Sequence, residues 1–267
     1  MSLRWVDRMA VEDDGDGEAV VLVHGLGGTT NTWTPLLPAL AGRRTVRIEL
    51  PGSGRSRDAY ALRDSAPGGG ALAIDTLVAA VLRVVGQLGL ARPHFVGHSL
   101  GTIVCQHLAL RAPERVAGLA LFGPLAAPPD AARTGLTARA ARARAEGMFG
   151  VADAIVGGTL SASTRAEQPV TVAMVRESLL AQDPEGYART CEALAGAQPA
   201  AIERIESSVL LVAGDEDPVA PVHGARALSQ RLRASRVEVL GRCGHWMTFE
   251  RAQSCQGLLR EFLERGR

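Results

Sequence analysis

The chain has 267 residues and a formal net charge of +1, and 46% of its residues are hydrophobic. This apolar fraction is typical of a folded globular protein and excludes a disordered chain or a fibrous repeat. The near-neutral charge argues against nucleic acid as a partner, because no surplus of positive charge is available to displace phosphate counterions.

Short apolar runs rich in β-branched residues alternate with segments of helical spacing along the chain. Strands are predicted over residues 19–23, 45–50, 94–96, 116–122, 208–213 and 236–240. Helices are predicted over residues 71–88 and 100–111, and a helical stretch follows each of the last two strands. This alternation predicts an α/β fold, with a mostly parallel sheet covered by helices on both faces.

The alternation is interrupted between residues 125 and 203. That stretch contains helical pieces, such as residues 137–148 and 171–181, and no convincing strand. We predict a core made of residues 1–124 and 204–267 and a helical cap made of residues 125–203. Ligands of open α/β sheets bind at the carboxyl ends of the strands, so we expect the cap to cover that edge.

Side-chain inventory excludes several further kinds of chemistry. All 29 cations are arginine, and the absence of lysine excludes both Schiff-base catalysis and a P-loop. The four cysteines are far apart and form neither a disulfide framework nor a zinc site, so we expect no metal and no cofactor. Because no apolar run approaches about 18 residues and no signal sequence is recognisable, we expect a cytoplasmic protein without a membrane partner.

Ser99 lies in a G-x-S-x-G motif, residues 97–101, between a predicted strand and the helix that follows. In that context the motif is typical of a nucleophile elbow, in which glycines let strand and helix approach and the serine hydroxyl is exposed on a strained turn. The alternative is a glycine-rich turn with Ser99 as a helix N-cap. We predict that Ser99 is a nucleophile.

A serine nucleophile needs a base and an acid that orients the base. His245 follows the last predicted strand, in a loop that can reach back over the sheet edge to Ser99. His98 is a poorer base, because successive residues of a tight turn point in different directions. The acid is expected between serine and histidine in chain order. Asp217 is our prediction, and Asp215, after the same strand, is the alternative.

Hydrolysis also needs donors aimed at the developing oxyanion. The amide of Leu100, at a helix N-terminus, is one candidate, and the amide of Leu26, in the glycine-rich residues 24–28, is the other. Trp33, His98 and Trp246 are candidates for contact with the substrate, although both tryptophans fit a core position equally well.

Four arginines cluster in the first half of the predicted cap: Arg133, Arg139, Arg142 and Arg144. Their alanine-rich surroundings favour a solvated helix face. The alternative is that one of them pairs with a substrate carboxylate, which the planar guanidinium can bind through two hydrogen bonds.

The order of these motifs resembles the α/β-hydrolase superfamily over nearly the whole chain. It comprises His24-Gly25, the elbow around Ser99, Asp217 and His245. Residues 180–194 and 213–221 resemble more narrowly the 3-oxoadipate enol-lactonases and related non-haem haloperoxidase-like esterases. The resemblance implies a helical cap on the hydrolase fold and a small-molecule ester or lactone substrate.

We therefore expect a serine hydrolase that cleaves a small carboxylic ester or lactone through an acyl-enzyme. A carbon–carbon bond hydrolase with the same triad is one alternative, and turnover of vinylogous diketones but not of simple esters would distinguish it. A non-catalytic ligand-binding protein on the hydrolase fold is another, and lasting retention of a ligand would favour it. The sequence leaves the oligomeric state open.

Overall fold

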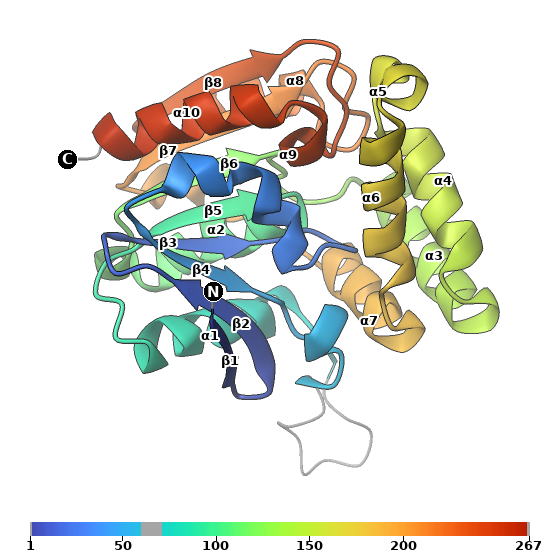
Figure 1. Cartoon of the computed structure of the whole chain (residues 1–267), viewed down its shortest axis with the longest axis horizontal. Coiled ribbons are helices and arrows are strands. Elements are labelled where there is room, and N and C mark those ends of the chain that lie inside the picture. The colour runs from blue at the N-terminus through green and yellow to red at the C-terminus, as the bar shows by residue number, and fades with distance from the viewer. Residues whose placement is uncertain (1, 60–70, 266–267) are drawn as a thin grey trace.

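The computed structural model of the chain describes residues 2–59 and 71–265, and Figure 1 shows its layered arrangement of sheet and helices. One sheet of eight strands has the order β1-β2-β4-β3-β5-β6-β7-β8. The pairs β1–β2 and β2–β4 are antiparallel, and the other pairs are parallel. The strands are β1 Ser2–Val6, β2 Met9–Asp14, β3 Ala19–Val23, β4 Arg44–Ile48, β5 His94–His98, β6 Gly118–Phe122, β7 Ser208–Gly214 and β8 Ser235–Leu240.

The helices fall into two groups. Those packed along the sheet are α1 Ile74–Gln87, α2 Leu100–Arg111, α8 Val222–Arg231, α9 Met247–Glu250 and α10 Ala252–Arg265, with the 3-10 segment η1 Thr30–Leu40. Between β6 and β7 come α3 Asp130–Glu146, α4 Phe149–Thr159, α5 Ala162–Glu167, α6 Pro169–Leu180 and α7 Pro184–Ala195. We call these five helices the helical insertion. They gather at one end of the sheet, on the right in Figure 1.

Two apolar cores form because successive strand residues point to opposite faces of the sheet. In β3, Val21 and Val23 belong to the cluster that includes α1, α2 and much of the helical insertion. Val20 and Leu22 belong to a second cluster, which includes η1 and α10. The continuous apolar run of β3 is therefore explained by burial on both faces.

The sequence identified the parallel part of the fold and missed the N-terminal hairpin. Helix α2 has the predicted bounds, and α1 is shorter than residues 71–88 by a few residues at its start. Strands β1 and β2 were not predicted. Residues 2–5 of β1 are exposed, and β2 carries acidic residues, so neither strand shows an apolar pattern. Instead, Asp13 of β2 pairs with Arg44 of β4 at 2.9 Å and with Arg4 at 3.1 Å.

The carboxyl ends of the parallel strands β3, β5, β6 and β7 face the helical insertion (Figure 1). The loops that follow these strands therefore meet at the edge of the sheet that the helical insertion covers. Within the described residues, no helix is long and apolar enough to cross a bilayer.

Candidate active site

Ser99 stands at the turn between β5 and α2 with a strained backbone, at φ 51° and ψ −117°. Positive φ is disfavoured for residues with a Cβ atom and is typical of a nucleophile elbow. The turn is tight because both motif glycines touch neighbouring backbone. A Cβ atom on Gly101 would lie 2.0 Å from the carbonyl oxygen of Val23, and one on Gly97 would lie 2.7 Å from that of Gly101. The Ser99 side chain makes no N-cap hydrogen bond, which contradicts the capping alternative.

The hydroxyl of Ser99 is directed at His245 instead. Its Oγ lies 2.8 Å from His245 Nε2, and His245 Nδ1 lies 2.7 Å from Asp217 Oδ2. Because a carboxylate can only accept, Nδ1 carries the proton, which leaves Nε2 free to accept from the serine hydroxyl. The three side chains thus form one continuous line of hydrogen bonds, and all three residues are buried.

Asp217 is fixed by its own loop. Its second oxygen, Oδ1, accepts the backbone N–H groups of Val219 at 2.8 Å and Ala220 at 2.9 Å. Burial alone would raise the pKa of this carboxyl, but His245 and the two N–H groups hold the pKa below its ordinary value. The alternative acid, Asp215, points elsewhere, because its Oδ1 accepts the N–H of the residue two before His245 at 3.0 Å.

Glu250, which no sequence motif singles out, fixes the loop that carries His245. This carboxylate is buried, and its Oε2 accepts the N–H of Ser161 at 2.9 Å and of Gly244 at 3.1 Å. Its Oε1 accepts the N–H of Trp246 at 3.1 Å. Glu250 therefore holds the residues on both sides of His245 and ties them to Ser161, the N-cap of α5 in the helical insertion.

The two residues whose backbone N–H groups were predicted to bind an oxyanion both lie next to Ser99. Leu100 is the first residue of α2, so its N–H has no acceptor inside the helix, and the positive end of the helix dipole lies there. Leu26 lines the cavity next to Ser99. The hydrogen bond from the N–H of Gly28 to the carbonyl of Gly25, at 3.0 Å, closes the turn that contains Leu26.

His24 and His98 are buried beside this site and form hydrogen bonds with backbone groups around it. His24 Nε2 accepts the N–H of Leu50 at 3.0 Å, and its Nδ1 donates to the carbonyl of Gly25 at 2.8 Å. His98 Nε2 donates to the carbonyl of His245 at 2.8 Å. Burial lowers the pKa of His98 to about 3, so its imidazole is neutral at physiological pH.

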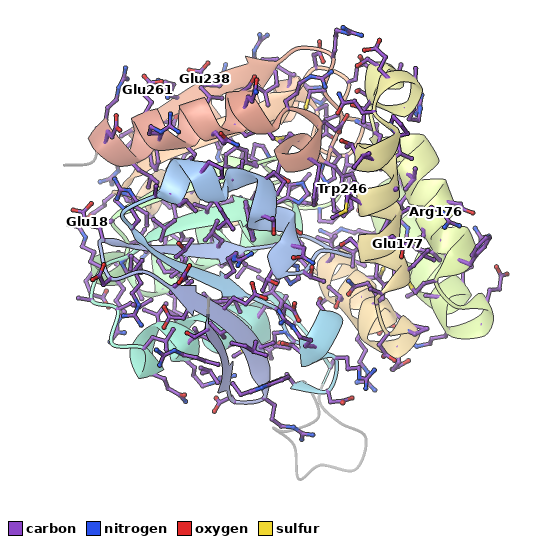
Figure 2. The ribbon with its side chains drawn as sticks, in the orientation of Figure 1. Glu18, Arg176, Glu177, Glu238, Trp246 and Glu261 are labelled. Carbon is purple, nitrogen blue, oxygen red and sulfur yellow. The ribbon has the colours of Figure 1, made fainter. Side chains whose placement is uncertain are left out.

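A cavity of about 280 Å³ opens onto Ser99 and His245. It is bounded by the Leu26 loop, by residues after β6 and β7, and by the helical insertion. Trp246 also lines it, as the sequence predicted, and lies where α9 meets the helical insertion (Figure 2). The remaining lining residues are Leu125, Pro128, Pro129, Ala132, Gly135, Leu136, Arg139, Ile155, Thr159, Tyr187, Leu194, Pro218 and Val219.

Two residues predicted to contact substrate do not line this cavity. Trp33 is fully buried on the opposite face of the sheet, where its ring packs edge-on against Phe122 at 6.5 Å. Its place in the core follows from η1, which lies over that face. His98 points behind Ser99, toward the backbone of His245, because successive residues of the elbow diverge. Both predictions of substrate contact are corrected.

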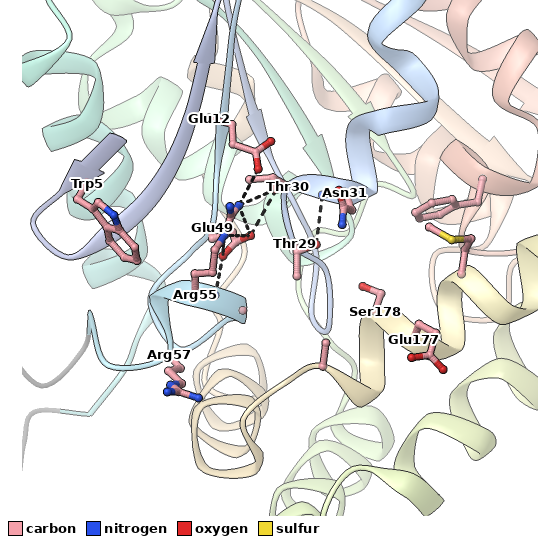
Figure 3. Close-up of a pocket in the computed structure, with 14 residues that line it drawn as sticks. Trp5, Glu12, Thr29, Thr30, Asn31, Glu49, Arg55, Arg57, Glu177 and Ser178 are labelled. Atoms are coloured by element: carbon pink, nitrogen blue, oxygen red, sulfur yellow. Dashed lines mark hydrogen bonds and ion pairs between the residues drawn. The ribbon is translucent and has the colours of Figure 1, made fainter. Parts of the chain in front are cut away.

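A larger depression, of about 700 Å³, lies outside the Leu26 loop and contains neither Ser99 nor His245. Figure 3 shows that three of its charged side chains pair with one another: Arg55 contacts Glu12 and Glu49, each at 2.8 Å. Thr30 accepts from the same guanidinium at 3.0 Å. Among the described residues, no group of three or more His, Cys, Asp or Glu side chains could hold a metal ion.

Comparison with known proteins settles the family. The family model described as alpha/beta hydrolase fold matches residues 18–252. The chain is an α/β-hydrolase. Its structure superimposes on that of the enol-lactonase from Burkholderia xenovorans LB400 with a TM-score of 0.86 and 28% sequence identity. The superposition covers 98% of this chain and 100% of the other chain. This confirms the resemblance that the sequence motifs indicated.

Two curated relatives differ in what their names say they do. A 2-hydroxymuconate semialdehyde hydrolase from Pseudomonas sp. (strain CF600) is 28% identical over 96% of this α/β-hydrolase and 90% of its own length. A dihydrolipoyllysine-residue acetyltransferase component of an acetoin cleaving system from Pseudomonas putida is 39% identical over 121 residues. That match spans 45% of this chain and only 29% of the acetyltransferase component.

Proposed function

We propose that this hydrolase cleaves a small carboxylic ester or lactone, with Ser99 as nucleophile, His245 as general base and Asp217 as the acid that orients the base. The observation that carries this proposal is the continuous hydrogen-bonded line from Ser99 Oγ through His245 to Asp217 Oδ2, at 2.8 Å and 2.7 Å. It ends in a small, mainly apolar cavity, where a carbonyl carbon can approach the serine oxygen.

The reaction proceeds in two halves. Ser99 Oγ attacks the carbonyl carbon while its proton passes to His245 Nε2, and the Asp217 carboxylate stabilises the imidazolium. The N–H groups of Leu26 and Leu100 donate to the oxyanion of the tetrahedral intermediate. The intermediate then collapses to an acyl-enzyme, and the leaving alkoxide takes the proton from His245. Water, deprotonated by the same imidazole, attacks the acyl carbon and releases Ser99.

The predicted division of the chain fits this mechanism. In the proposal, residues 1–124 and 204–267 hold the triad, and residues 125–203 cover it as a lid. The helical insertion supplies much of the cavity wall, including Leu136 of α3 and Ile155 of α4. An apolar wall excludes water and strengthens the electrostatic interactions at the reacting atoms.

A carbon–carbon bond hydrolase is the second candidate. It is supported by the 28% identity to the 2-hydroxymuconate semialdehyde hydrolase over 96% of the chain. The same nucleophile, base and oxyanion donors serve both reactions, so the triad does not discriminate between them.

The test is a substrate panel assayed with the wild type and with Ser99→Ala. The panel contains para-nitrophenyl esters, aliphatic lactones and a vinylogous diketone with a dienol tail. Turnover of esters or lactones that depends on Ser99 supports the proposal. Turnover of the diketone alone would replace it with carbon–carbon cleavage. Tight binding of a panel compound without turnover of any would favour the non-catalytic ligand-binding alternative.

A further inference from the structure

The cavity beside Ser99 contains one permanent positive charge, the guanidinium of Arg139 on α3. The other lining residues are apolar or uncharged apart from the titratable His245, and no carboxylate of the described chain lines the cavity. Its volume of about 280 Å³ is near the lower end of the roughly 300–1,000 Å³ typical of ligand pockets. The cavity therefore suits a small ligand, and a ligand that fills it lies within reach of a cation.

Arg139 differs from the other arginines of α3. Arg133 donates to two backbone carbonyls at the end of α7. Arg142 pairs with Glu146 at 2.8 Å, and Arg144 pairs with two glutamates of α7. Arg139 is half-buried, and in residues 2–59 and 71–265 it has no carboxylate partner. A partly desolvated guanidinium without an anion leaves strong donors available for a ligand.

Tyr187 of α7 supplies a second unused polar group at the same place. Its side chain is fully buried and lines the cavity, yet its hydroxyl has no hydrogen-bond partner within the described structure. Burial raises the pKa of this phenol, and the nearby Arg139 guanidinium acts against that effect, so the two polar groups lie close together. Buried hydroxyls in proteins are nearly always satisfied, so this one is expected to meet a ligand.

Arg139 also stands where the cavity meets the surface. An outer groove of about 450 Å³ is lined by residues of α3 and α4. The groove and the cavity share Arg139, Ile155, Thr159, Pro218 and Val219. A ligand entering through this groove passes the guanidinium before it reaches Ser99, and a cation at such an entrance attracts anions.

We infer that the substrate carries a carboxylate, which the Arg139 guanidinium and the Tyr187 hydroxyl bind while the ester or lactone carbonyl lies at Ser99. The assignment of this anion to a substrate rests on the proposed function, whereas the anion-binding subsite follows from the residues that line the cavity. Of the four arginines that the sequence left equivalent, the structure assigns this role to one.

The test compares two substrates of equal chain length, mono(para-nitrophenyl) glutarate and para-nitrophenyl pentanoate. They differ in that a carboxylate replaces a methyl group. In Arg139→Gln we expect the ratio of kcat/KM for the anionic ester to that for the neutral ester to fall about 10- to 100-fold, mainly through KM. Tyr187→Phe lowers the ratio about 3- to 10-fold, and Arg139→Lys retains part of it.

The matched control is Arg226→Gln, which removes an exposed guanidinium on α8 that does not line the cavity. It changes the net charge equally, and we expect it to leave the ratio unchanged. A ratio that is the same in Arg139→Gln as in the wild type overturns the inference.

Calorimetric titration with glutarate alone separates the two proposals, because binding does not require hydrolysis. We expect Arg139→Gln to bind glutarate at least about 10-fold more weakly than the wild type. Arg139-dependent binding without hydrolysis of either ester supports the subsite and contradicts the proposed function. Ser99-dependent hydrolysis with equal glutarate affinity in both proteins supports the function and overturns the subsite.

Discussion

Replacing Glu250 by glutamine is predicted to destabilise the fold and to loosen the loop that carries His245. In the wild type, one oxygen of this buried carboxylate accepts two backbone N–H groups and the other accepts the N–H of Trp246. The oxygen of a glutamine can keep the first two bonds. Its amide group then faces the N–H of Trp246, so that a donor meets a donor.

The size of the effect follows from these three bonds. The substitution removes one charge-assisted hydrogen bond, about 1.5–3 kcal/mol, and weakens the other two by removing the charge. We therefore expect a loss of about 2–4 kcal/mol in the free energy of unfolding. At roughly 2–4 °C per kcal/mol for a chain of this size, the Tm falls by about 4–16 °C. Because His245 lies between two residues that Glu250 holds, kcat falls as well, by up to about 100-fold.

Thermal denaturation followed by circular dichroism measures the first effect, and para-nitrophenyl ester hydrolysis below the transition measures the second. Glu264→Gln on α10 is the control, because Glu264 is exposed and belongs to none of the buried contacts above. We expect its Tm to stay within a few degrees of the wild type. An equal Tm for Glu250→Gln and Glu264→Gln would refute the reasoning from the buried carboxylate.

Three further predictions concern the triad, the thiols and the Leu26 loop. Asp217→Asn lowers kcat about 10⁴-fold in ester hydrolysis, because the orienting carboxylate is lost. The pKa of Asp217 is depressed in the folded state, so its contribution to stability is present above the ordinary value of 3.8 and is lost as the pH falls through the folded value. The difference in unfolding free energy between wild type and Asp217→Asn, measured by urea titration, therefore shrinks below pH 3.8. All four cysteines are buried and burial raises the pKa of each, so a disulfide reagent reacts with them only after denaturation. Gly25→Ala places a Cβ atom 2.8 Å from that of Ser99 and lowers kcat about 100-fold while circular dichroism still reports a folded protein.

The following results would contradict these predictions. A stability difference for Asp217→Asn that stays constant through the acid range would contradict the depressed pKa. Rapid thiol modification of the folded protein would show that a cysteine is accessible. Full activity in Gly25→Ala would mean that the loop is looser around Ser99 than the close contact indicates.

Local sequence signals predicted the parallel part of the sheet and selected three distant residues that are linked by hydrogen bonds in the structure. The elbow around Ser99 is marked by glycines that only a close strand–helix approach requires, and chain order then directed attention to His245 and to the acid before it. The choice of Asp217 over Asp215 depended on a turn whose geometry the sequence implied through Gly214 and Pro218. In the structure, Asp217 Oδ2 lies 2.7 Å from His245.

Features that depend on long-range partners had no such signal. The strands β1 and β2 are stabilised by pairing with β4 and by ion pairs such as Asp13 with Arg44, which no local pattern contains. Trp33 was ambiguous because a large aromatic residue suits a pocket wall and a core equally. Arg139 could not be distinguished in the sequence from Arg133, Arg142 and Arg144. Those three arginines bind backbone carbonyls or carboxylates that are identified only in the folded structure.

The central claim is that Ser99 is the nucleophile, and the most direct measurement is para-nitrophenyl acetate hydrolysis by the wild type beside Ser99→Ala. The account predicts turnover by the wild type and a loss of about 10⁶-fold in kcat in the variant, because the attacking oxygen is removed. The variant keeps the fold, since the Ser99 hydroxyl contacts only His245 in the hydrogen bonds described. A wild type that hydrolyses the ester no faster than Ser99→Ala would contradict the claim.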